Sequence, residues 1–172
     1  MDLLSLPVGA HAPQIVNAVV EVPYGCTNKY EYDKSLKLFR LDRPLYASVH
    51  YPGEYGFIPS TLSPDGDALD ILILVTRPTF TGCVMEARAV GVLKMIDQGK
   101  PDEKILAVAK SSPTHAEIKS YKDLAPHLLR EVEHFFSVYK DLEGKKTEVR
   151  GWQNAAVAHH LIDEGAQRFR RA

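Results

Sequence analysis

The sequence predicts an α+β fold, in which a closed sheet is covered on its outside by helices. Strand-like segments fill the first two-thirds of the chain and helix-like segments fill the last third, and this segregation is typical of α+β domains. The 172 residues suit one domain with its own hydrophobic core, which we expect to span residues 1–172. The chain shows no internal repeat, low-complexity tract or linker.

The strands are predicted from β-branched and apolar runs or from strict alternation of polar and apolar residues. In the alternating segment 29–33, Lys29 and Glu31 share one face, whereas Tyr30 and Tyr32 share the other. Residues 51–68 are dense in Pro and Gly, which indicates a long ordered loop. The predicted strands are residues 15–22, 29–33, 37–41, 69–75, 83–96, 104–110 and 147–152.

Two helices are predicted near the end of the chain, over residues 126–140 and roughly 154–170, because apolar residues recur there at helical spacing. The apolar stripe of the first helix contains Leu128, Leu129, Val132, Phe135, Phe136 and Tyr139. The residues of the second helix expected to face the core are Val157, Leu161, Ile162 and Phe169.

Composition excludes several classes of partner. The net charge is −1, from 21 basic and 22 acidic residues, so there is no basic footprint for nucleic acid and no polybasic membrane anchor. No apolar stretch approaches the ~20 residues needed to cross a bilayer, and residues 1–14 lack the basic start of a signal peptide. Cys26 and Cys83 lack the spacing of a metal or redox motif. We therefore expect a cytoplasmic protein with reduced thiols.

An acidic segment, Asp65-Gly66-Asp67-Ala68-Leu69-Asp70, is the most informative part of the sequence. Gly66 permits a sharp turn that lets the three carboxylates converge, and converging carboxylates need a hard divalent cation as counter-charge. An exposed acidic turn explains the segment equally well. The segment is not an EF-hand loop, because its sixth position holds Asp70 rather than Gly.

A second acidic cluster, with Asp97 and Asp102, lies in the turn between two predicted strands. Taken alone it is a solvated hairpin loop. Combined with the first cluster it provides a site for more than one metal ion, and Mg²⁺ prefers a few carboxylates together with water and phosphate oxygens.

Cations and phenols are interleaved with these acids. A polyanion would be held by such groups, and an arginine grips phosphate in bidentate fashion. Each residue also has a plainer interpretation as a sheet ion pair, a surface side chain or a packing residue. The candidates are Glu21, Lys29, Glu31, Arg43, Tyr51, Tyr55, Lys104, Tyr139 and Lys140.

At these residues the chain resembles the soluble family I inorganic pyrophosphatases. Residues 65–70 resemble the family signature D-[SGDN]-D-[PE]-[LIVMF]-D, with Ala68 in place of Pro or Glu. Gln98 stands where many bacterial members carry glutamate. The resemblance covers nearly the whole chain in order, through residues 29–31, 51–58, 90–97, 134–142 and 151–155.

The resemblance implies a five-stranded OB-like β-barrel with flanking helices, assembled as a homohexamer, and several Mg²⁺ ions in each active site, with Mn²⁺ as the alternative. Asp67 would be the general base, with Tyr55 close by. The implied metal ligands are Asp65, Asp70, Asp97 and Asp102, with Glu31 assisting an ion that arrives with substrate. The implied phosphate-binding residues are Lys29, Arg43, Tyr55, Lys104, Tyr139 and Lys140, supported by Glu21 and Tyr51.

The predicted activity is therefore hydrolysis of pyrophosphate to two phosphates by a metal-activated water. Two alternatives remain. One is another metal-dependent nucleotide phosphohydrolase, for which the sequence offers no dedicated base-stacking motif. The other is a non-enzymatic OB-type binding module, since such barrels often bind single-stranded nucleic acid; the charge of −1 argues against it.

Overall fold

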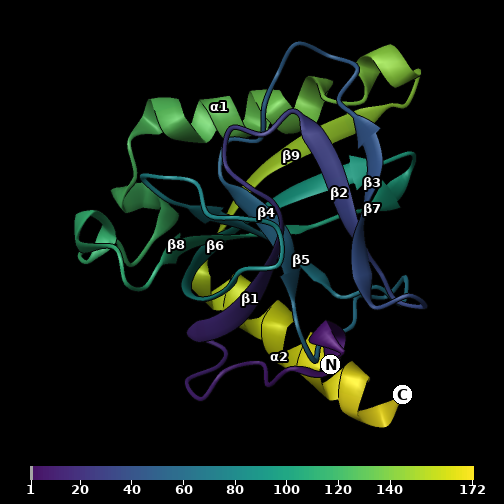
Figure 1. Cartoon of the computed structure of the whole chain (residues 1–172). Helices are drawn as coiled ribbons and strands as arrows, with labels where there is room; N and C mark the ends of the chain where they lie inside the picture. Colours follow the sequence, from purple (N-terminus) through teal and green to yellow (C-terminus); the bar gives the residue numbers. More distant parts are fainter. Residues whose placement is uncertain (1) are drawn as a thin grey trace.

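The computed structural model describes residues 2–172, which form a sheet-dominated fold with two α-helices (Figure 1). Four short 3-10 turns lie between the larger elements: η1 Leu3–Ser5, η2 Pro113–His115, η3 Tyr121–Asp123 and η4 Asp141–Glu143. The helices are α1 Pro126–Val138 and α2 Ala155–Arg171. The strands are β1 Ile15–Val22, β2 Asn28–Asp33, β3 Leu38–Pro44, β4 Glu54–Ile58, β5 Leu69–Leu74, β6 Val84–Asp97, β7 Lys100–Pro101, β8 Lys104–Ala109 and β9 Thr147–Asn154.

Five of these strands pair in a closed cycle. β1 pairs with β4, β4 with β5, β8 with β6 and β6 with β1, all antiparallel, whereas β5 and β8 are parallel. A sheet closed in this way has no free edge among its five strands, which is the arrangement of an OB-like barrel. The 14-residue strand β6 also pairs with β7 and β9. The predicted α+β class with a closed sheet is confirmed.

The prediction that residues 51–68 form one long loop is wrong, because they contain strand β4. All five residues of β4 are buried, and the strand pairs on both sides, with β1 and β5. Gly56 belongs to this strand because a side chain there would collide with the backbone carbonyl of Val19. Glycine in a strand interior marks such a close backbone approach, whereas the sequence pattern treated it as a turn signal.

Strands β2 and β3 form a separate two-stranded sheet beside the barrel (Figure 1). A small apolar cluster joins this hairpin to the barrel, with Tyr32, Val19 and Phe57 buried at its centre. The phenol of Tyr32 also accepts a hydrogen bond from the backbone N–H of Leu3, at 3.2 Å. Side-chain packing therefore fixes where the hairpin sits.

The two helices pack on different core clusters, and Figure 1 shows them on opposite sides of the barrel. The predicted stripe of α1 is confirmed, since all six residues belong to one cluster with Tyr51 and Tyr55. α1 ends at Val138 rather than at residue 140, and Lys140 is the N-cap residue directly before the turn η4. Asn154 caps α2 by accepting a hydrogen bond from the N–H of Val157. Within residues 2–172, no helix is long and apolar enough to span a membrane.

Candidate active site

The acidic segment 65–70 runs from an exposed turn into strand β5. Gly66 has a φ of 91°, which requires glycine-like freedom and makes the turn sharp. Asp65 and Asp67 are exposed, and the N–H of Asp67 donates to Asp65 Oδ1 at 3.1 Å. Asp70 lies inside β5 and is only part-exposed. The turn thus presents two carboxylates to solvent and leads directly to a third.

Lys104 gathers two of the predicted metal ligands around one charge. The parallel register that pairs Ile71 with Ile105 places Asp70 on β5 beside Lys104 on β8. The Lys104 side chain is only 4% exposed, and its Nζ contacts Asp70 Oδ2 and donates to Asp102 Oδ1 at 2.6 Å. Carboxylates from β5 and from the 97–102 region therefore meet at one point.

Burial and charge shift the titration of these groups. Burial alone would lower the pKa of Lys104, but Asp70 and Asp102 outweigh it, so that the pKa is raised and the ammonium stays charged. Burial raises the pKa of Asp102, assisted by the charge on Asp70. Burial likewise raises the pKa of the Tyr55 phenol, which donates to Asp70 Oδ2 at 2.8 Å. Tyr55 is therefore a hydrogen-bond donor at neutral pH.

The second acidic loop is a tight turn between β6 and β7. Gln98 and Gly99 both have positive φ, of 50° and 82°, as expected for a two-residue hairpin turn. Asp97, at the end of β6, forms an ion pair with Lys140. Lys140 comes directly after Tyr139, the C-cap residue of α1. Tyr139 is buried, and burial raises the pKa of its phenol. The sheet and α1 thus meet at this end of the barrel.

The β2–β3 hairpin supplies a second set of cations. Lys29 and Arg43 are directly opposed across the hairpin. Lys29 forms an ion pair with Glu31 and lies 3.4 Å from Asp42, which also contacts Arg43 Nη1. As predicted, Lys29 and Glu31 share one face of the hairpin.

Glu21 lies between the hairpin and the acidic cluster. Its Oε1 accepts a hydrogen bond from the N–H of Tyr32 at 2.8 Å. Burial raises the pKa of Glu21 to about 8; the Tyr32 hydrogen bond opposes that rise, while the negative charges of Asp70 and Glu31 add to it. Glu21 is thus a buried carboxyl within electrostatic reach of Asp70 and Glu31.

Tyr51 is 1% exposed and packs against the rings of Phe135, at 4.7 Å, and Tyr55, at 5.3 Å. Its hydroxyl has no hydrogen-bond partner within residues 2–172. The ring of Tyr51 is therefore a packing group of the core. Its hydroxyl, which has no partner within residues 2–172, is still able to donate a hydrogen bond.

The donor set fits a hard divalent cation, although the side chains are not arranged as a finished cage. Carboxylate oxygens are the ligands that Mg²⁺ prefers, and Asp70 with Asp102 already brackets one cation, the Lys104 ammonium. Asp97 and Asp67 are paired with Lys140 and Lys34. Over the described part of the chain, no three acidic, His or Cys side chains lie together as a metal-ligand group, and Asp65 does not contact Lys104.

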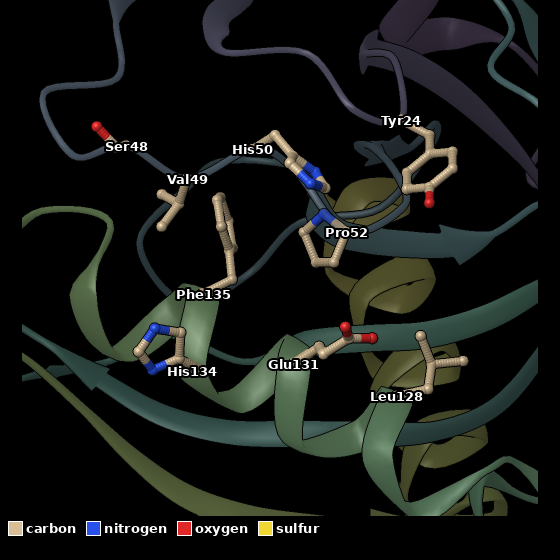
Figure 2. Close-up of a pocket in the computed structure, with 9 residues that line it drawn as sticks. All are labelled: Tyr24, Ser48, Val49, His50, Pro52, Leu128, Glu131, His134 and Phe135. Atoms are coloured by element: carbon tan, nitrogen blue, oxygen red, sulfur yellow. The ribbon is translucent and has the colours of Figure 1, made fainter.

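Of two pockets within residues 2–172, one is lined by predicted site residues and the other is not. A pocket of about 290 Å³ on the hairpin is lined by Glu31, Asp42 and Arg40, among others. The other pocket, of about 270 Å³, lies between α1 and residues 48–52, and Figure 2 shows His50 and Glu131 on its two sides. None of the predicted site residues lines this second pocket, so we assign the chemistry to the acidic cluster.

Three charged residues in contact with the predicted site were not predicted from the sequence. Lys34 Nζ lies 2.5 Å from Asp67 Oδ1, Asp42 contacts both hairpin cations, and Glu143 Oε1 accepts from Arg43 Nε at 2.7 Å. Asp42 was detectable as the neighbour of Arg43. Nothing in the sequence indicates the pairing of Glu143 with a residue 100 positions away.

The fold and the site together define an OB-like barrel whose rim gathers carboxylates, lysines and tyrosines. Residues 18–170 match the family described as Inorganic pyrophosphatase. The chain is 49% identical over 158 residues to an inorganic pyrophosphatase of Halalkalibacterium halodurans, covering 92% of this chain and 97% of that protein. It is 47% identical to an inorganic pyrophosphatase of Nostoc sp., covering 99% of this chain and 100% of that protein.

A solved structure of an inorganic pyrophosphatase has the same fold as this chain. The inorganic pyrophosphatase of Thermus thermophilus superposes with a TM-score of 0.97 at 42% identity, covering 99% of both chains. The chain therefore belongs to the inorganic pyrophosphatase family.

Proposed function

We propose that the protein hydrolyses inorganic pyrophosphate to two phosphates with the help of divalent metal ions. The observation that carries this proposal is the meeting of Asp70 and Asp102 at Lys104, beside the phenol of Tyr55. The site thus combines carboxylates for cations with donors for a polyanion. Family membership supports the same activity.

The cations of this chain would bind and orient the substrate. Pyrophosphate is a polyanion, and phosphoryl transfer depends mainly on positioning and on neutralising charge. Lys29 and Arg43 would contact phosphate oxygens from the hairpin, and Lys140 would do so from the end of α1. The buried ammonium of Lys104 and the phenols of Tyr55 and Tyr139 would add donors from the barrel side.

Asp65, Asp70, Asp97 and Asp102 would hold Mg²⁺, with Glu31 assisting, and Mn²⁺ is the alternative ion. When bound, the metal supplies charge neutralisation and lowers the pKa of water. The carboxylates of this chain fix where that positive charge sits, and Glu21 adds a buried carboxyl behind them. Asp70 and Asp102, now paired with Lys104, and Asp97, now paired with Lys140, would turn carboxylate oxygens from these lysines to the ion.

Asp67 would accept the proton of the attacking water. Its side chain is 70% exposed, and its only cationic partner in the described residues is Lys34, whose side chain is also exposed. Exposed pairs of this kind contribute little free energy, so Asp67 can exchange its contact with Lys34 for one with a water molecule.

A direct assay separates this proposal from its alternatives. Phosphate release is measured from pyrophosphate and from ATP side by side, with Mg²⁺ and with EDTA. Release from pyrophosphate that requires Mg²⁺ is expected. Faster release from ATP indicates a nucleotide phosphohydrolase, and salt-dependent oligonucleotide binding without any release indicates a binding module.

We further propose that the protein acts in the cytoplasm as a homohexamer of single-domain chains. The family resemblance supports this proposal. Sedimentation equilibrium should give six chains per particle, and a monomeric particle would remove the hexamer from the proposal.

A further inference from the structure

Arg43 is held at two of its three guanidinium nitrogens. Nε donates to Glu143 Oε1 at 2.7 Å, and Nη1 contacts Asp42 Oδ2. Nη2 is buried and has no hydrogen-bond partner within residues 2–172. A buried donor without a partner costs free energy. An oxyanion that reached Nη2 would recover this cost.

Glu143 is placed to hold this arginine from the other side of the site. It ends the turn η4, three residues after Lys140, and its side chain is only 5% exposed. Its second oxygen lies 3.3 Å from Lys145 Nζ. Burial raises the pKa of Glu143, but the hydrogen bonds from Arg43 and Lys145 outweigh burial and lower it overall. Glu143 is therefore an ionised acceptor.

We infer that Glu143 is a positioning residue that orients Arg43 to bind a diphosphate anion, an inference that rests on the proposed function. Glu143 would not touch the anion itself. By holding Nε, it fixes the plane of the guanidinium and leaves Nη2 for the ligand.

The contact also joins two separate parts of the fold. Arg43 lies on the β2–β3 hairpin, which shares no sheet with the barrel, and Glu143 follows α1. The ion pair therefore sets how far the hairpin cations stand from Lys140. Groups that bind a small anion must be held within about 0.5 Å of their working positions, which a long, unsupported arginine side chain cannot achieve.

The test measures how tightly the protein binds imidodiphosphate, a non-hydrolysable diphosphate, by calorimetry in Mg²⁺. Glu143→Ala should raise the Kd about tenfold, since hydrogen bonds to charged groups are worth about that factor or more. Glu143→Gln keeps an oxygen acceptor for Nε and should lose less. In an Arg43→Ala background, Glu143→Ala should change the Kd by less than about twofold, because coupled residues are not additive.

Matched variants control for folding and for charge. Glu86→Ala removes an exposed glutamate paired with Lys110 and should leave the Kd unchanged. Lys145→Ala removes the other partner of Glu143 and should do likewise. An equal loss in the wild-type and Arg43→Ala backgrounds, or the same loss from Lys145→Ala, overturns the inference.

The same series separates this inference from the proposed function. Wild-type protein that binds imidodiphosphate but releases no phosphate from pyrophosphate refutes the proposed hydrolysis, while the Glu143 coupling is still read from binding. Wild-type protein that binds no imidodiphosphate overturns both.

Discussion

Replacing Glu21 by glutamine should change how the stability of the protein depends on pH. Burial raises the pKa of Glu21 from 4.5 to about 8, with smaller contributions from Asp70 and Glu31. Glutamine keeps an oxygen that accepts the hydrogen bond from the N–H of Tyr32, but it carries no charge at any pH. The substitution therefore isolates the ionisation of this one carboxyl.

The direction in which the free energy of unfolding changes with pH follows from the number of protons bound by the folded and unfolded states. Between pH 4.5 and about 8, the folded protein keeps a proton on Glu21 that the unfolded chain has lost. Raising the pH through this interval therefore favours unfolding. The free energy of unfolding should fall by about 1.4 kcal/mol per pH unit, with an upper limit of about 5 kcal/mol over the whole interval. Below pH 4.5 Glu21 contributes no such loss.

Urea unfolding at pH 5 and pH 8, in EDTA to remove divalent cations, measures this effect. The difference between Glu21→Gln and wild type should grow in favour of the variant as the pH rises. Glu86→Gln, at an exposed ion pair, is the control and should run parallel to wild type. Parallel profiles for Glu21→Gln and wild type would refute the reasoning.

Three further predictions concern the site and the fold. Asp67→Asn should keep the Mg²⁺ titration midpoint while turnover falls about 100-fold or more, as for loss of a general base; turnover at the wild-type rate removes Asp67 from that role. Asp70→Ala should weaken Mg²⁺ binding and activity together, by more than about tenfold, and an unchanged metal titration contradicts its assignment as a ligand. Gly56→Ala should lower the free energy of unfolding by about 1–3 kcal/mol or more in urea, because its methyl group meets the carbonyl of Val19; wild-type stability would mean that this approach is not tight.

Much of the fold was predictable because its strands follow simple patterns. The strand at 15–22 has the predicted bounds, and the stripe of α1 packs as its spacing indicated. The sequence pattern does not predict β4, because Pro52, Gly53 and Gly56 are residues typical of loops. In the structure, Gly56 allows the backbone of Val19 to approach closely. That close approach depends on a strand more than thirty positions away in sequence, which local patterns do not report.

The candidate site shows the same limit. The carboxylates were recognised by their clustering and by the family resemblance, and β5 and β8 do bring Asp70 to Lys104. Their roles as metal ligands stay predictions. The pairing of Arg43 with Glu143 could not be predicted from the sequence, because the hairpin and η4 come into contact only in the folded chain.

The hairpin that carries Lys29 and Arg43 has no β-ladder to the barrel that carries Asp70 and Asp102. Backbone ladders lock two strands in a fixed register, whereas side-chain packing can shift by fractions of an ångström when one residue changes size. The distance between the hairpin cations and the barrel carboxylates therefore depends on the side chains of the small cluster around Tyr32. A substitution in this cluster would therefore move the cations relative to the carboxylates and leave the strand pairing of the barrel intact.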